Sequence, residues 1–302
     1  MFFYYLVILG YYNMPDFLIG YLNAPSLLRL KKIGNFCGMD YASKDIYKFR
    51  EYISRFGHSL SVCLNAYSLT HDKETALKAL FHDVSTPCFS HVIDYMNKDY
   101  KKQESTEAYT EIIIRNDEYL KRCLDEDGID INSLINYKSN TIVDNDRPKL
   151  CADRLDGVIT TDIGWTQVLS KEDIKNIIED RCIYTNEYGE DEIGFKTIEV
   201  AKKVVEVSNL IDIYCHSKED NFMMDLLARI TRLIIQKKYI KYEDLYYLDE
   251  EELFSLLNNI NDKEVEHLLY QFKNIKKDEI SDIFLPSVKK RLLRPIVNGV
   301  RL

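Results

Sequence analysis

The sequence is poor in the residues that bend or cross-link a polypeptide chain. Only 11 Gly and 6 Pro occur among its 302 residues, a composition that favours long helices and short connections. The seven cysteines are scattered singly, their number is odd, and none belongs to a CxxC pair. A disulfide-stabilised extracellular scaffold is therefore not indicated, and we expect free thiols in a cytoplasmic protein.

The chain also lacks an excess of positive charge and a long apolar run. Its 40 Lys and Arg are outnumbered by 49 Asp and Glu, and the net charge of −9 argues against a stable nucleic-acid partner. The apolar segment Phe2–Gly10 is too short to span a bilayer and lacks the basic region of a signal peptide. We expect it to begin a packed strand or helix, or to be an upstream extension if Met14 is the functional start, with no membrane partner.

What the sequence does contain is helical periodicity, carried by the 46% of its residues that are apolar. Predicted helices cover 24–33, 45–69, 73–82, 89–97, 104–114 and about 152–160, with two more in 198–239 and two in 249–274. Only 181–197 alternates, around a turn at Gly189, and predicts a β-hairpin. The expected fold is all-α: a core over 1–170, and over 171–302 a mostly helical part that packs on it and contains the hairpin.

Two histidines and two aspartates stand out as candidate metal ligands. The apolar run Ala79–Phe81 leads directly into His82 and Asp83, and a carboxylate at the end of a buried helix needs a partner such as a cation. His58 lies on the preceding predicted helix, and Asp153 lies beside apolar residues in the segment Cys151–Asp156. This donor set suits Mn, Fe, Ni, Zn or Mg and leaves open positions for water and phosphate. The alternative is that each histidine is an ordinary core or surface residue.

A second His-Asp dipeptide, His71-Asp72, has different surroundings. Thr70 and Lys73 flank it, and the helix predicted from residue 73 begins directly after it. We therefore interpret Asp72 as the N-cap of that helix in a solvated loop, and not as a metal ligand.

The segments around the candidate ligands resemble a known family. They are Leu28–Ile33, Arg55–Val62 (RFGHSLSV), His82–His91 (HDVSTPCFSH), Cys151–Asp156 (CADRLD), Ile213–His216 and Tyr242–Leu253. Over about residues 15–275 the chain resembles the HD-domain phosphohydrolase superfamily, and most of all its dNTP triphosphohydrolases, including the SAM-and-HD-domain type. The first four segments are specific in combination, whereas the last two are weak alone.

The resemblance implies an HD-domain helical bundle in which His58, His82, Asp83 and Asp153 hold a divalent metal ion. It implies that this ion polarises a phosphoryl oxygen and positions a water for attack on phosphorus. His91 and Asp94 would be an acid/base pair, and Arg55, Arg154 and Tyr214 would contact the substrate. Arg29 is a further candidate phosphate ligand. Relatives of this kind self-associate, so a homo-oligomer is also expected.

The sequence departs from the family at four positions. Thr86 and Thr106 stand where the family has histidines, and Gly157 replaces a tyrosine that packs on the substrate. Glu206 occupies the place of an arginine that contacts the outer phosphates, and a carboxylate there would repel a triphosphate by about 1 kcal/mol or more. These departures predict a smaller phosphate ester or a diphosphate as the substrate.

Three hypotheses follow. The first is a metal-dependent phosphohydrolase acting on a nucleotide or similar phosphate ester. The second is a catalytically weakened nucleotide sensor or regulatory pseudo-enzyme, favoured by the replaced histidines. The third is an interaction scaffold that keeps the fold only for stability. The basic tail over 286–302 is interpreted as a solvated helix face, or as a contact for protein or nucleic acid.

Overall fold

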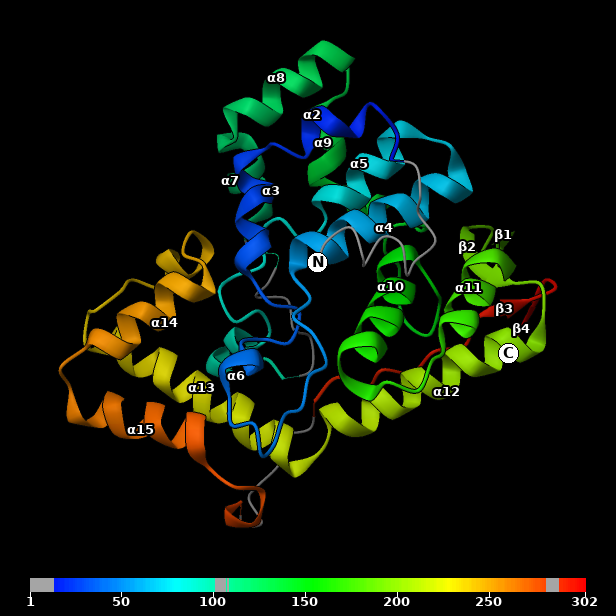
Figure 1. Cartoon of the computed structure of the whole chain (residues 1–302). Coiled ribbons are helices and arrows are strands. Elements are labelled where there is room, and N and C mark those ends of the chain that lie inside the picture. The colour runs from blue at the N-terminus through cyan, green and yellow to red at the C-terminus, as the bar shows by residue number, and fades with distance from the viewer. Residues whose placement is uncertain (1–13, 101–106, 108, 281–287) are drawn as a thin grey trace.

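The computed structural model describes residues 14–100, 107, 109–280 and 288–302, and it is mostly helical with a small four-stranded sheet (Figure 1). The segment Phe2–Gly10 and the position Thr106 lie outside the described residues. The helices of the first half are α2 (Leu18–Tyr21), α3 (Pro25–Arg29), α4 (Arg55–Thr70), α5 (Lys73–Phe81), α6 (Val92–Asn97), α7 (Thr110–Asn116), α8 (Glu118–Asp127), α9 (Ile131–Ile135) and α10 (Ala152–Thr161). Those of the second half are α11 (Lys171–Asp180), α12 (Ile198–Cys215), α13 (Lys218–Gln236), α14 (Glu250–Asn259) and α15 (Lys263–Asn274).

The centre of the first half is helix α4, which packs against α5 and α10 (Figure 1). Helix α4 begins at Arg55 because Ser54 is its N-cap and its side chain accepts a hydrogen bond from the Gly57 amide. The prediction that this helix starts at residue 45 was wrong. The chain is extended at Ser54, where it forms an isolated antiparallel bridge with Gly34.

Two other predicted helices begin later than expected. Phe89 and Ser90 have positive φ angles of 67° and 46°, so the helix predicted over 89–97 forms only from Val92 as α6. The helix predicted over 104–114 begins at Thr110 as α7. Asp72 does cap α5, accepting a hydrogen bond from the Thr75 amide at 2.7 Å, as predicted.

The predicted hairpin is part of a larger sheet. Strands β1 (Arg181–Thr185) and β2 (Asp191–Phe195) pair antiparallel, and β3 (Ile296–Val297) then joins β2 in parallel and is followed by β4 (Val300–Arg301). Gly194 lies opposite Ile296, and a Cβ at that position would come within 2.5 Å of the Ile296 carbonyl oxygen. The interpretation of the basic tail as a solvated helix face is therefore wrong, because its end is a strand pair.

The two halves of the chain pack on each other. Helix α13 contacts α6, and α12 contacts α10. In Figure 1 the C-terminal segment, drawn in red, passes close to α12 on its way to β3. Among the described residues, none of the helices combines the length and the apolar character that crossing a bilayer requires.

Candidate metal centre and pocket

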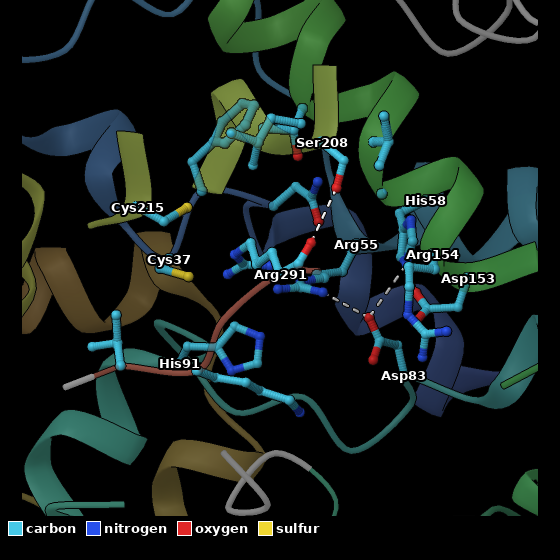
Figure 2. Close-up of a pocket in the computed structure, with 18 of the residues that line it drawn as sticks. Cys37, Arg55, His58, Asp83, His91, Asp153, Arg154, Ser208, Cys215 and Arg291 are labelled. Carbon is cyan, nitrogen blue, oxygen red and sulfur yellow. Dashed lines mark hydrogen bonds and ion pairs between the residues drawn. The ribbon is translucent and has the colours of Figure 1, made fainter. Parts of the chain in front are cut away.

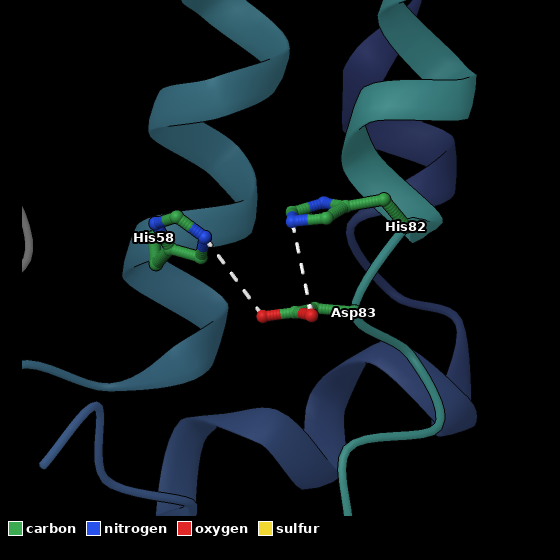
Figure 3. Close-up of side chains that lie close together, drawn as sticks. All are labelled: His58, His82 and Asp83. Atoms are coloured by element: carbon green, nitrogen blue, oxygen red, sulfur yellow. Dashed lines mark ion pairs between the residues drawn. The ribbon is translucent and has the colours of Figure 1, made fainter. Parts of the chain in front are cut away.

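The structure brings the four predicted metal ligands together. Helix α4 carries His58, the end of α5 leads into His82 and Asp83 (Figure 3), and α10 carries Asp153 in its first turn. The Asp153 Oδ1 atom lies 3.1 Å from His58 Nε2 and 3.5 Å from His82 Nε2. Each imidazole Nε2 also lies 3.8 Å from one Asp83 oxygen. Ligands at about 2.1 Å from one ion stand roughly 3–4 Å apart. The ligand atoms of His58, His82 and Asp83 all lie within 4.8 Å of one another, and Asp153 approaches this group through the two imidazoles, so these separations fit a metal site.

Hydrogen bonds orient both imidazoles for metal binding. His58 Nδ1 bonds to Asp156 Oδ2 at 2.7 Å, and His82 Nδ1 donates to the Ala79 carbonyl at 2.7 Å. Each bond leaves Nε2 directed at the site, which is the arrangement that metal-binding histidines adopt in proteins. The Nε2 atom of His82 is buried and has no hydrogen-bond partner. An ion at this point would satisfy that atom, so the residues present fit a divalent metal.

The electrostatics of the site favour charged carboxylates. Burial raises the pKa of Asp83, but His82, Arg55 and His58 outweigh it and hold that pKa at about 2. Burial also raises the pKa of Asp153, but the hydrogen bond from His58 and the nearby charges of His82 and His58 outweigh it and place that pKa well below its ordinary range. Burial lowers the pKa of His58, yet its hydrogen bonds to Asp153 and Asp156 raise it to about 10. The site thus offers two anionic ligands, and an incoming cation displaces a proton.

Two predicted substrate-binding arginines lie beside the centre and already have partners. Arg55, which is buried, donates from its Nη1 to Asp83 Oδ2 at 2.8 Å, and its Nε has no partner. Arg154 donates to Asn145 Oδ1 at 2.6 Å and to the carbonyls of Asn145 and Lys149. Arg55 therefore keeps an unpartnered donor beside the centre, whereas Arg154 mainly fixes the loop before α10.

The two residues predicted to be an acid/base pair bond to each other, and only His91 reaches the pocket. His91 Nδ1 bonds to Asp94 Oδ2 at 2.9 Å, and His91 lines the pocket while Asp94 is fully buried behind it. Tyr214 does not line the pocket and packs edge-on against Trp165, with ring centroids 5.4 Å apart. Arg29 donates to the carbonyls of Thr86 and Leu248 and also lies outside the pocket. Neither Tyr214 nor Arg29 is therefore placed to contact a ligand.

The centre opens into a pocket of about 470 Å³ (Figure 2). One part of its wall is aromatic, formed by Phe36, Tyr47, Phe49 and Trp165. The rings of Phe36 and Phe49 stack with their centroids 4.3 Å apart. Gly157 also faces the pocket, and a Cβ there would meet nothing within 4 Å, so the missing tyrosine does leave free volume. Such a wall can accept a planar apolar group such as a nucleobase.

The structure changes the interpretation of two departures from the family, Thr86 and Glu206. Thr86 is buried outside the pocket, and its hydroxyl has no partner. Glu206 is exposed on α12 and does not line the pocket, whereas Ser208, Ile211 and Cys215 of that helix do. The expected repulsion of a triphosphate by Glu206 is therefore wrong, because helix α12 turns that carboxylate to the surface.

Several pocket residues were missed by the sequence analysis. Lys138, Arg147, Lys289 and Arg291 add positive charge to the wall. The tail was recognised as basic, but nothing in it indicated that residue 291 returns to the pocket. Asp144, Cys151 and Asp153 form a further group whose ligand atoms lie within 4.8 Å of one another, next to the first.

Comparison with known proteins finds a distant sequence similarity. No protein family's sequence profile matches the chain. The chain is similar to a Bacillus subtilis (strain 168) protein named "Uncharacterized protein YdhJ", with 24% identity over 251 residues that cover 81% of this chain and 74% of the other. That likeness carries no assignment of activity.

Proposed function

We propose that the protein is a metal-dependent phosphohydrolase of the HD-domain type that acts on a nucleotide or a similar phosphate ester. The observation that carries the proposal is the convergence of two imidazole Nε2 atoms and two carboxylates, with the buried His82 Nε2 left unpartnered. A bound divalent ion would supply Lewis-acid polarisation of a phosphoryl oxygen and of a water. The residues that would hold it are His58, His82, Asp83 and Asp153.

The chain's own side chains supply the rest of the site. Arg55 presents an unpartnered Nε beside the centre and can donate to a phosphate oxygen. His91 faces the pocket and is oriented by Asp94, so its Nε2 can transfer a proton at the pocket wall. The aromatic wall would hold a base and the charged centre a phosphate, so the pocket suits a ligand with one apolar and one anionic end.

The test compares two variants of the purified full chain. His82→Ala removes a centre ligand, and His71→Ala removes an exposed imidazole from the other His-Asp dipeptide. We expect wild type and His71→Ala to bind the same number of Mn, Ni, Co or Mg ions per chain. Both should also hydrolyse at least one member of a panel of dNTPs, NTPs, NMPs and simple phosphate esters. His82→Ala should lose both properties. Equal metal content in all three proteins would contradict the proposal.

A second candidate is a nucleotide sensor, which one observation favours. The position of a family histidine near the scissile phosphate is Thr86, which is buried and outside the pocket. Among the described residues that line the pocket, only His91 offers an imidazole besides the metal ligands. A sensor would bind a nucleotide tightly in the same screen and release no phosphate or phosphate chain.

A further inference from the structure

The segment 288–295, which we term the C-terminal strap, is fixed along one side of the pocket. The Ser208 hydroxyl donates to the Arg291 carbonyl at 3.2 Å, and the Arg291 amide donates to Asp212 Oδ1 at 2.7 Å. Further along, the Arg294 amide donates to the Pro148 carbonyl at 2.9 Å. The strap backbone is thus held by α12 and by the loop before α10, independently of the Arg291 side chain.

The Arg291 side chain enters the pocket without a carboxylate partner. Figure 2 shows Arg291 beside Cys37 and Cys215, with Arg55 and Asp83 on its other side. Within the described part of the chain Arg291 forms no ion pair, and its Nε is buried without a hydrogen-bond partner. A buried guanidinium N–H left unpaired costs free energy that an anionic ligand would recover.

Other cations gather around Arg291 in the pocket wall. Burial, together with the like charges of Arg154 and Arg291, lowers the pKa of Arg147 to about 10. Burial and the charges of Arg147, Arg291 and Arg154 also lower the pKa of Lys289, which lies at the pocket rim. Like charges held this close repel one another, and a ligand carrying several negative charges would relieve the repulsion.

We infer that the C-terminal strap builds a second anion subsite, with Arg291 at its centre and Lys289 and Arg147 beside it, that binds the far phosphates of a phosphate chain. This rests on the proposed function, in which the phosphate nearest the metal ligands contacts Arg55. The strap subsite then selects nucleoside di- or triphosphates over monoesters. The expectation from the sequence was a smaller phosphate ester or a diphosphate, and its argument against a triphosphate depended on Glu206 facing the ligand; the strap subsite admits the triphosphate as well.

The experiment measures binding of inorganic phosphate and of tripolyphosphate to the metal-free full chain by calorimetry at fixed ionic strength. Removing the metal prevents chelation by tripolyphosphate and keeps the readout independent of turnover. Wild type should bind tripolyphosphate at least about tenfold more tightly than phosphate, since one charge-assisted hydrogen bond contributes about 1.5–3 kcal/mol. Arg291→Met should lose this preference and keep its phosphate affinity, and Arg291→Lys should restore part of it.

The matched control is Lys290→Met, which removes an exposed cation of the same strap that does not line the pocket. It should bind both probes as wild type does. If circular dichroism shows that Arg291→Met is unfolded, the same two binding measurements on Lys289→Met test the subsite. Tripolyphosphate affinity that stays at the wild-type value in a folded variant overturns the strap subsite. The protein could instead prefer tripolyphosphate through Arg291 and yet bind no metal when metal is supplied. That result would support the strap subsite and contradict the proposed function.

Discussion

The two ends of helix α5 carry the same dipeptide, His-Asp, in opposite surroundings. At the start, His71 and Asp72 are exposed, and Asp72 accepts a hydrogen bond from the Thr75 amide. At the end, His82 is 4% exposed and faces Asp83, His58 and Asp153. Identical side chains thus serve as a helix cap in one place and as candidate metal ligands in the other, because only the second pair is enclosed by α4 and α10.

The largest expected difference in metal binding between the two ends of α5 comes from an Asp→Asn substitution made at each end. Asp83→Asn replaces an anionic ligand by a neutral amide and should abolish stoichiometric metal binding, since divalent ions in such sites bind ionised carboxylates. Asp72→Asn keeps a good N-cap and should leave metal content unchanged. Both proteins are compared by elemental analysis after dialysis. Full metal content in Asp83→Asn would remove Asp83 from the centre.

A smaller effect on metal binding is expected at Asp156, which contacts the candidate ligand His58. Asp156→Asn removes the carboxylate that orients His58 through Nδ1 and should weaken metal binding by about 10- to 100-fold. Asp173→Asn, at the capping box of α11, provides a half-buried control carboxylate that is also hydrogen-bonded and lies away from the centre. Direct metal titration measures both affinities. Unchanged affinity in Asp156→Asn would show that the orientation of His58 does not depend on this bond.

The same contrast explains what could be predicted from the sequence. Helical periodicity placed His58 and His82 on neighbouring helices, and the residue types then indicated a metal, because the information lies within a few turns of α4, α5 and α10. The capping role of Asp72 is equally local. Asp156 was part of a recognised segment, but its bond to His58 depends on how α10 rotates against α4, which periodicity does not specify.

Features that depend on distant pairing were missed or mistaken. The strap reaches the pocket because β3 pairs with β2 across about a hundred residues of chain, and two-residue strands leave almost no alternation to detect. Glu206 was assigned to the pocket from the family resemblance, but Ser208, two residues further along α12, lines the pocket instead. Positions on a helix two residues apart lie on different faces, so a small error of alignment reverses the conclusion.

The metal centre and the exposed start of α5 should also respond differently to pH. Without metal, burial lowers the pKa of His58 but its carboxylate partners raise it to about 10, so its charged form stabilises the fold. That contribution is complete below the unfolded value of about 6.5 and is lost as the pH rises through about 10. Metal binding must displace this proton, so the apparent affinity should rise about tenfold per pH unit in this window.

Metal titration between about pH 6.5 and about pH 8.5, in buffers of different ionisation enthalpy, measures both the slope and the number of protons released. His71→Ala, at the exposed end, should leave both unchanged. A flat profile for the wild type would mean that His58 is already neutral in the metal-free protein, in conflict with its hydrogen bonds to two carboxylates.

The smallest expected effect lies at the exposed end. Asp72→Ala removes the hydrogen bond to the Thr75 amide and should lower the free energy of unfolding by about 1 kcal/mol, while Asp72→Asn should restore most of it. Denaturant titration measures this loss. The cap and the centre are nine helical residues apart, and the centre is also held by α4 and α10. Metal affinity should therefore stay at the wild-type value in Asp72→Ala, and a parallel loss of metal would show that α5 transmits the fraying of its first turn to His82.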